Sequence, residues 1–293
     1  MIRVAPAGWS YPDWDGPVYP RAKPKGFHPL RLLGRYLDGV EVNSSFYALP
    51  RVDIVSRWLE LTSPWPEFRF VAKLYQGFTH RPLDEGRWSE EAEQFLAALE
   101  PLRRRSKLAA ILVQFPVTFQ HGPEEVRRLG RLRSLLGDVP LVLEVRHHTW
   151  YETPVYDVLR GLGYSLAHID LPSAWNHPPP RHPATGPIGY LRLHGRNEEQ
   201  WFRPGAGRDD RYNYLYPPRE VGELARKAAS IASETDETWV VTNNHFAGQA
   251  VANAIEIEFM LNGKEPVSAW PEIVAAFPHL GPLTRVEGGG LFD

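Results

Sequence analysis

The sequence predicts an irregular α/β barrel of the (β/α)8, or TIM-like, type. Eight short apolar segments are mostly separated by segments with helical spacing of apolar residues, an alternation typical of a parallel sheet covered by helices. The chain has 293 residues, which suits one barrel of about 250 residues. An open doubly wound sheet is the alternative. Neither GxGxxG nor GxxxxGK[ST] follows the first apolar segment, which counts against the common nucleotide-binding versions of that sheet.

The first half of the chain predicts four strands and four helices. Apolar residues at helical spacing mark the helices, and glycine or proline marks several boundaries: Gly39 ends the first helix and Pro123 begins the fourth. The segment 88–105 has an acidic first turn and a basic last turn, which suit the helix dipole. The predicted strands are 2–8, 39–50, 68–76 and 107–116, and the predicted helices are 28–39, 50–62, 88–105 and 122–138.

The second half continues the alternation with one interruption. The segment after the sixth strand contains too many prolines for a regular helix, so a Pro-rich loop is expected to replace one helix of the ideal repeat. The barrel is expected to cover 1–265, with 266–293 as a C-terminal extension packed on it or trailing from it. One predicted strand begins at Pro140, and the other three cover 164–170, 188–195 and 238–246. The predicted helices cover 153–163, 217–235 and 248–263.

Composition excludes several classes of function. The net charge is −2, so the overall field does not indicate nucleic acid or an anionic membrane as partner. The chain has no cysteine, which excludes disulfides, thiolate zinc sites and a cysteine nucleophile. Neither a secretory signal nor an apolar run of roughly 18 residues is recognisable, so a cytoplasmic protein without a membrane span is expected. No cofactor or oligomeric state is predicted.

Polar residues recur at the carboxyl ends of the predicted strands. The pairs Glu41/Asn43, Glu144/Arg146, His168/Asp170 and Arg192/His194 each occupy one parity, and alternate residues of a strand share a face. In a β/α barrel the outer face packs on helices, so this polar parity should point into the pocket at the carboxyl ends of the strands. Candidate catalytic residues are Glu41, Lys73, Glu144 and His194; candidate substrate-binding residues are Asn43, Gln114, Arg146, Asp170, Arg192, Tyr214, Asn243 and Asn244.

The same charges also admit a structural interpretation. Glu144 and Arg146 could form an ion pair, and the other inward charges could neutralise one another. Buried ion pairs add little to stability, because desolvation offsets their attraction. Four charged strands would therefore stabilise a barrel poorly, which favours a functional pocket. Tyr212, Tyr214 and Tyr216 alternate, so one face of that loop could wall the pocket or could simply plug it.

Eight motifs follow one another along the chain: GWSYPDWDGPVYP, VEVNSSFYALP, FRFVAKLYQGFTH, LVQFP, LEVRHHTW, YLRLHGRN, YNYLY and VVTNNHFAGQAVANAIE. In this order they resemble the YecE-like family, catalogued as domain of unknown function 72. The resemblance covers roughly 1–265 and implies an irregular TIM-like barrel whose pocket is built from the strand ends, without implying a reaction. The chain departs from the family in carrying His147-His148-Thr149 where members often have a single His-Pro.

Three functions are compatible with these residues. In the first, an enzyme holds a small phosphate- or carboxylate-bearing substrate through Arg146, Arg192 and Lys73, with Glu144 or Glu41 as general base and His194 as an acid or base near neutral pH. Lys73 as a Schiff-base nucleophile requires a pKa lowered by its cationic neighbours. The second is a metal-dependent sugar- or nucleic-acid-processing barrel, in which Glu41, Glu144, Asp170 and His194 could ligate a cation. Nearby Arg and Lys compete for these carboxylates, so no residue is assigned as a metal ligand. The third is a non-catalytic ligand-binding protein.

Overall fold

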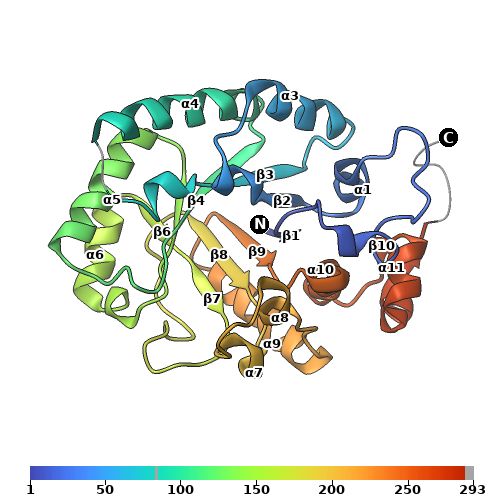
Figure 1. The fold of residues 1–293 in the computed structure, drawn as a ribbon. Coiled ribbons are helices and arrows are strands. Elements are labelled where there is room, and N and C mark those ends of the chain that lie inside the picture. The colour runs from blue at the N-terminus through green and yellow to red at the C-terminus, as the bar shows by residue number, and fades with distance from the viewer. Residues whose placement is uncertain (83–84, 288–293) are drawn as a thin grey trace.

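The strands form two parallel sheets in an α/β fold. The computed structural model describes residues 1–82 and 85–287, and Figure 1 shows the strands surrounded by helices. One sheet has the order β1-β9-β8-β7 and the other β2-β3-β4-β5-β6. Their bounds are β1 Ile2–Pro6, β2 Gly39–Val42, β3 Arg69–Lys73, β4 Leu108–Gln114, β5 Leu141–Glu144, β6 Tyr164–Leu166, β7 His168–Asp170, β8 Ile188–Leu193 and β9 Glu237–Thr242.

The two sheets meet at two places. Strands β6 and β7 are consecutive and are separated only by Ala167, whose N–H donates to Leu143 O at 2.9 Å. On the other side, an isolated parallel bridge joins Ala7 to Glu41, and Gly8 N–H donates to Glu41 O at 2.8 Å. The segment 164–170, predicted as a single strand and the sixth of the chain, therefore contributes one strand to each sheet.

The predicted long helices are all present, and most end within two or three residues of their predicted bounds. Pro29 occupies the first turn of α1, and His28 Nδ1 accepts a hydrogen bond from Leu30 N–H at 3.1 Å, which caps that helix. No helix lies in the Pro-rich segment 171–187. The helices are α1 Pro29–Tyr36, α3 Val52–Leu61, α4 Glu85–Arg104, α5 Pro123–Leu136, α6 Thr153–Gly161, α9 Pro218–Ala232 and α10 Gln249–Leu261.

Several short elements were not predicted. α2 (Ser44–Tyr47), α7 (Glu198–Trp201) and α8 (Arg208–Tyr212) follow strand ends, and 3₁₀ turns occupy Pro12–Trp14, Gln76–Phe78, His148–Trp150, Phe246–Gly248 and Pro278–Leu283. They have too few residues for a periodic pattern to identify them. No helix in the described residues is long and apolar enough to cross a membrane.

The C-terminal segment packs against the N-terminal loop. It contains a two-stranded parallel sheet, β10 (Val267–Ala269) and β11 (Thr284–Val286), with α11 (Pro271–Ala276) between them. Trp270 is buried and donates its Nε1–H to Val18 O at 2.6 Å. Figure 1 shows α11 and β10 beside α1 and α10. The division into 1–265 and 266–293 stays a prediction, and residues 288–293 lie outside the described residues.

Side chains from both sheets meet in one buried cluster. Its members alternate along the strands and are mostly small, with Tyr190 and Trp239 as the large exceptions. Tyr190, Val142, Val71 and Val241 share the parity of the polar residues that end their strands. The alternation therefore sends the polar strand ends to the same side as this cluster. The full cluster is Ala5, Ala7, Val71, Ala109, Ala110, Leu112, Val142, Ala167, Ile188, Tyr190, Trp239 and Val241.

Gly39 is expected to be intolerant of even one added methyl group. A Cβ there would lie 2.4 Å from Arg69 O and 2.7 Å from the Trp239 ring. We expect Gly39→Ala to lower the free energy of unfolding by about 1–3 kcal/mol, because a close-packed site accommodates extra volume only by shifting its neighbours. Urea unfolding measures the change. Gly161→Ala is the matched control, because nothing lies within 4 Å of its Cβ position; an equal loss in both variants would contradict the packing argument.

Candidate functional site

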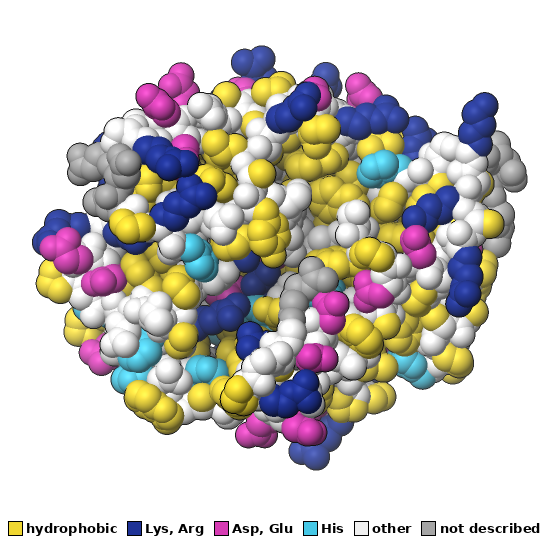
Figure 2. All heavy atoms as spheres, viewed as in Figure 1, with side chains coloured by type: hydrophobic (Ala, Val, Ile, Leu, Met, Phe, Trp, Pro, Cys, Tyr) yellow, Lys and Arg dark blue, Asp and Glu magenta, His cyan; other side chains and the backbone are white. Residues whose placement is uncertain are grey.

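A cavity of about 710 Å³ opens at the carboxyl ends of the strands. Figure 2 shows a hollow near the middle of this face, with Lys and Arg side chains gathered in it. Half of the twelve predicted site residues line the cavity: Asn43, Lys73, Gln114, Arg146, Arg192 and Asn243. Each follows or ends a strand, as the alternation predicted. Their roles in catalysis or binding stay predictions.

Two buried carboxylates hold Arg192 in place. Glu41 accepts hydrogen bonds from Arg192 Nε and Nη2 at 2.9 and 2.6 Å, and Glu144 accepts one from Arg192 Nη1 at 2.9 Å. The Tyr190 hydroxyl donates to Glu41 at 2.7 Å. Glu41 and Glu144 are fully buried, whereas Arg192 reaches the cavity with 2% of its side chain exposed. Because the pairing is bidentate and planar, it fixes both the position and the orientation of the guanidinium.

Arg146 is the more accessible cation. Its Nε and Nη2 donate to Glu144 Oε1 at 3.0 and 2.8 Å, and 19% of its side chain is exposed. Its Nη1 makes no hydrogen bond within residues 1–82 and 85–287, so its donors remain available to a ligand. The expected Glu144–Arg146 ion pair is therefore present, and it lies in the wall of a cavity.

The charge network keeps Glu144 ionised. Burial alone would raise its pKa, but Arg192 and Arg146 lower the pKa well below the ordinary carboxyl value. Burial likewise opposes the charge on Arg192, and Glu41 and Glu144 overcome that effect and raise its pKa. All four carboxylate oxygens of Glu41 and Glu144 accept hydrogen bonds from arginine. Their evident role is to hold the arginines, and a base at Glu144 would have to break these contacts.

His194 lies beneath the cavity, where it is held as a neutral ring. Asn243 Nδ2 donates to His194 Nδ1 at 3.1 Å, and Nε2 lies 3.5 Å from Glu144 Oε1. Burial lowers the pKa of His194 to about 3, although Glu144 opposes the shift. This contradicts the expectation that His194 exchanges protons near neutral pH, because the ring is completely enclosed.

Lys73 differs from the other cations of the cluster. Its Nζ lies 4.1 Å from the centroid of the Phe46 ring and lines the cavity. In the described part of the chain, Nζ has no carboxylate within salt-bridge distance. Burial, and then the charge of Arg192, lower the pKa of Lys73 to about 7, although Glu144 and Glu41 oppose this effect. The amine can therefore gain or lose a proton near neutral pH.

Besides the buried Glu41, Glu144 and His194, three predicted site residues lie outside the cavity lining. The parity explains two of these three. Ala167 belongs to the inner cluster, so Asp170 points to the opposite face, where it accepts from Arg196 at 2.9 and 2.7 Å and from the Tyr216 hydroxyl at 2.7 Å. Asn244 follows the inward Asn243 and therefore points away; it donates to Tyr214 O at 2.8 Å. Placing Asp170 and Asn244 in the pocket was wrong.

The tyrosine loop contributes a different residue from the one predicted. Tyr214 directs its hydroxyl to Glu220 at 3.0 Å, whereas Tyr212 lines the cavity. The rings of Tyr212 and His194 lie 6.0 Å apart. The choice of Tyr214 was wrong, because Tyr212, the last residue of α8, lines the cavity and Tyr214 does not.

Aromatic residues, counting histidine, form much of the cavity wall, and they were not among the predicted site residues. They come from the N-terminal loop, α2, α7 and the loop after β9, and Tyr11 stacks on His245 with centroids 4.6 Å apart. The signal available in the sequence was the unusual length and Trp/Tyr content of the loop after β1, but loop residues carry no periodicity that assigns their direction. The missed lining residues include Trp9, Tyr11, Phe46, Tyr47, His80, His177, Trp201, Tyr212 and His245.

The described residues do not present a set of metal ligands. No group of three or more His, Asp or Glu side chains within 1–82 and 85–287 is arranged to hold a metal ion. The carboxylates of the cavity are instead saturated by arginine.

Comparisons with known proteins agree with the sequence motifs. The sequence profile of the family described as “Protein of unknown function DUF72” matches residues 3–274. UPF0759 protein YunF of Bacillus subtilis (strain 168) is 28% identical over 275 residues, covering 89% of this chain and 95% of YunF. UPF0759 protein YecE of Escherichia coli (strain K12) is 31% identical over 152 residues, covering 52% of this chain and 50% of YecE.

Solved structures of the same family have the same fold. A DUF72 family protein from Thermotoga maritima MSB8 is 30% identical, with a TM-score of 0.76 over 89% of this chain and 99% of that chain. One from Enterococcus faecalis V583 is 28% identical, also with a TM-score of 0.76, over 89% of this chain and 96% of that chain. With the profile matching nearly the whole chain, the protein belongs to the DUF72 family.

Proposed function

We propose that the protein is an enzyme that binds a small phosphate- or carboxylate-bearing substrate in the cavity at the strand ends. The observation that carries this proposal is the wall formed by Arg146 and Arg192, two guanidinium groups oriented by buried carboxylates and open to the cavity. Guanidinium groups match the geometry of such oxyanions. With Lys73 protonated, three cations oppose the two carboxylates Glu41 and Glu144, so the cluster retains a positive charge for an anion.

We also propose that the two sheets together form the irregular barrel. Support comes from the continuous segment 164–170, from the Ala7–Glu41 bridge, and from the inner cluster to which both sheets contribute. In such a barrel the carboxyl ends of the strands form the ordinary place for a substrate. This arrangement explains why polar residues from distant strands converge.

An enzyme is favoured over a simple binding protein because of Lys73. A binding site needs only fixed charges, whereas Lys73 is an amine with a pKa of about 7 at the edge of the cavity. Such a group can transfer protons at neutral pH. The net charge of the chain favours a small molecule over nucleic acid or a membrane as partner, and the composition is compatible with a cytoplasmic setting.

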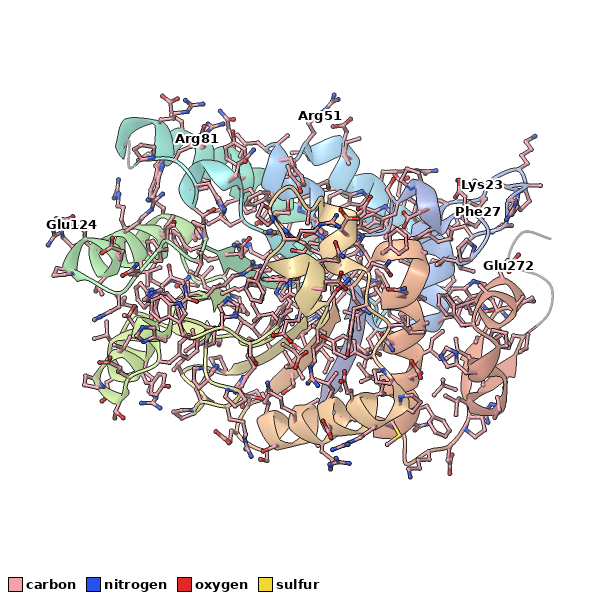
Figure 3. All side chains as sticks on the ribbon, turned by 60° about the horizontal axis from the view of Figure 1, so that its bottom comes forward. Lys23, Phe27, Arg51, Arg81, Glu124 and Glu272 are labelled. Carbon is pink, nitrogen blue, oxygen red and sulfur yellow. The ribbon has the colours of Figure 1, made fainter. Side chains whose placement is uncertain are left out.

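Sulfate tests the anion site, because it resembles phosphate and its charge does not change near neutral pH. We expect calorimetry at pH 7 to detect one bound sulfate, and Arg146→Gln to weaken it at least about 10-fold, equivalent to about 1.4 kcal/mol. Arg51→Gln is the control: Arg51 is exposed, pairs with Asp53 at 2.8 Å and lies on the outside in Figure 3. Sulfate binding that is absent, or equally strong in both variants, would refute the proposal.

A further inference from the structure

Lys73 has an amine without the partners that Lys107 and Lys23 have. Lys107 Nζ donates to Trp65 O at 2.6 Å and to Thr62 O at 3.2 Å, and Lys23 pairs with Asp15 at 2.8 Å. Among the described residues, Lys73 Nζ has neither a carbonyl nor a carboxylate partner; it lies 4.1 Å from the Phe46 ring centroid. An aromatic face does not occupy the nitrogen lone pair when the amine is neutral. The amine therefore faces the cavity ready to react.

The backbone fixes the place of this amine. Lys73 is the last residue of β3, where its register partner on β4 is Leu112. Ser45 Oγ lies 2.6 Å from Lys73 O and 3.0 Å from Val42 O, so the end of β3 is tied to the end of β2. A nucleophile on a strand end is held more firmly than one on a loop.

We propose that Lys73 is a catalytic nucleophile that forms a Schiff base with a carbonyl group of an anionic substrate. The charged groups that influence it come from the ends of three strands, β2, β5 and β8, and from the loop after β3: Glu41, Glu144, Arg146, Arg192 and His80. The arginines disfavour the ammonium form and so favour the neutral amine that such an attack requires. They also provide the site for the substrate's phosphate or carboxylate. This inference rests on the proposed anion site and names its substrate class: a carbonyl compound that carries an anionic group.

The chemistry requires no additional reactant. The Nζ lone pair attacks the carbonyl carbon and forms a C–N bond, while the carbonyl π pair moves to oxygen. A proton passes from nitrogen to that oxygen, giving a neutral carbinolamine. The hydroxyl group then takes a proton from a solvent water molecule, which becomes hydroxide, and departs as water. The nitrogen lone pair forms the C=N bond of an iminium ion as the C–O bond breaks. No oxidation or reduction occurs in these steps.

Glyoxylate with cyanoborohydride tests the nucleophile without knowledge of the natural substrate. Glyoxylate is a small aldehyde with a carboxylate, and the hydride converts any iminium ion into a stable carboxymethyl-lysine. We expect peptide mapping at pH 7.5 to find Lys73 modified at least about 10-fold faster than Lys23, since the amine is largely neutral there and an ordinary lysine is not. Sulfate in excess should slow labelling of Lys73 and leave Lys23 unaffected; Figure 3 shows Lys23 at the outer edge of the molecule.

The outcomes separate this inference from the anion site. Preferential labelling of Lys73 that sulfate suppresses supports both. In a second outcome, sulfate still binds and requires Arg146, but Lys73 is labelled no faster than Lys23. That result refutes the role of Lys73 as nucleophile and leaves the proposed anion site intact. Rapid labelling of Lys73 that sulfate does not affect, in a protein that binds no sulfate, overturns the anion site and the substrate class.

Discussion

Glu144→Gln is expected to lower the free energy of unfolding by about 3–5 kcal/mol, the usual cost of breaking a buried ion pair on one side. The glutamine would have about the same size, but its amide NH₂ would meet the donors of Arg146 or Arg192, which lie 2.8–2.9 Å from the carboxylate oxygens. A buried positive charge would also lose its counter-ion. Urea unfolding at pH 7 measures the loss.

Glu100→Gln is the control for this prediction. Glu100 pairs with Arg103 and Arg104 on the surface of α4, and an exposed pair contributes little, so no measurable change is expected. If Glu144→Gln were as stable as the parent protein, the carboxylate would not be needed to hold the arginines. The stabilisation by Glu144 should be present above the ordinary carboxyl pKa and should disappear as the pH falls through its lowered pKa.

The second large effect concerns the pH dependence of sulfate binding. The pKa of Lys73 is about 7, so the amine is protonated at pH 6 and mostly neutral at pH 8.5. We expect the affinity for sulfate to fall roughly 10-fold over that interval, because the anion stabilises the ammonium form. Calorimetry at the two pH values measures the change, and in buffers of different ionisation enthalpy it should reveal proton uptake on binding at pH 8.

Lys73→Met is the variant that decides this second prediction. It removes the titrating charge, so sulfate should bind more weakly at pH 6 and with little change up to pH 8.5. An unchanged slope in Lys73→Met would assign the titration to another group. The variant should fold well, because the depressed pKa means that the folded state disfavours the ammonium. In the parent protein, the buried ammonium of Lys73 lowers the free energy of unfolding at pH values below about 7. This destabilisation is lost as the pH rises from about 7 towards 10.5, the ordinary lysine pKa.

The helices and strands that place the site were predictable because their patterns are periodic. The alternation of Val142, Glu144 and Arg146 indicated a common face, and the same reasoning located Lys73, Gln114, Arg192 and Asn243. It failed at His168–Asp170, where both parities carry residues that could be buried. There Asp170 bonds to Arg196 and Tyr216, and His168 to His182 O. Alternation alone does not say which parity faces inward.

The sequence by itself determined the order of strands and helices, the absence of cysteine chemistry, the family, and the presence of charged strand ends. Local periodicity indicates the strands, the helices and the parity of the charged strand ends, since each element has its own spacing of apolar residues. Only the tertiary structure decided that Glu41 and Glu144, more than 100 residues apart, form ion pairs with the same Arg192. It also decided that Lys73 has no ion-pair partner among the described residues and lies beside Phe46 instead. Which charges cancel and which remain available depends on distances between strands, and no pattern within one strand encodes those distances.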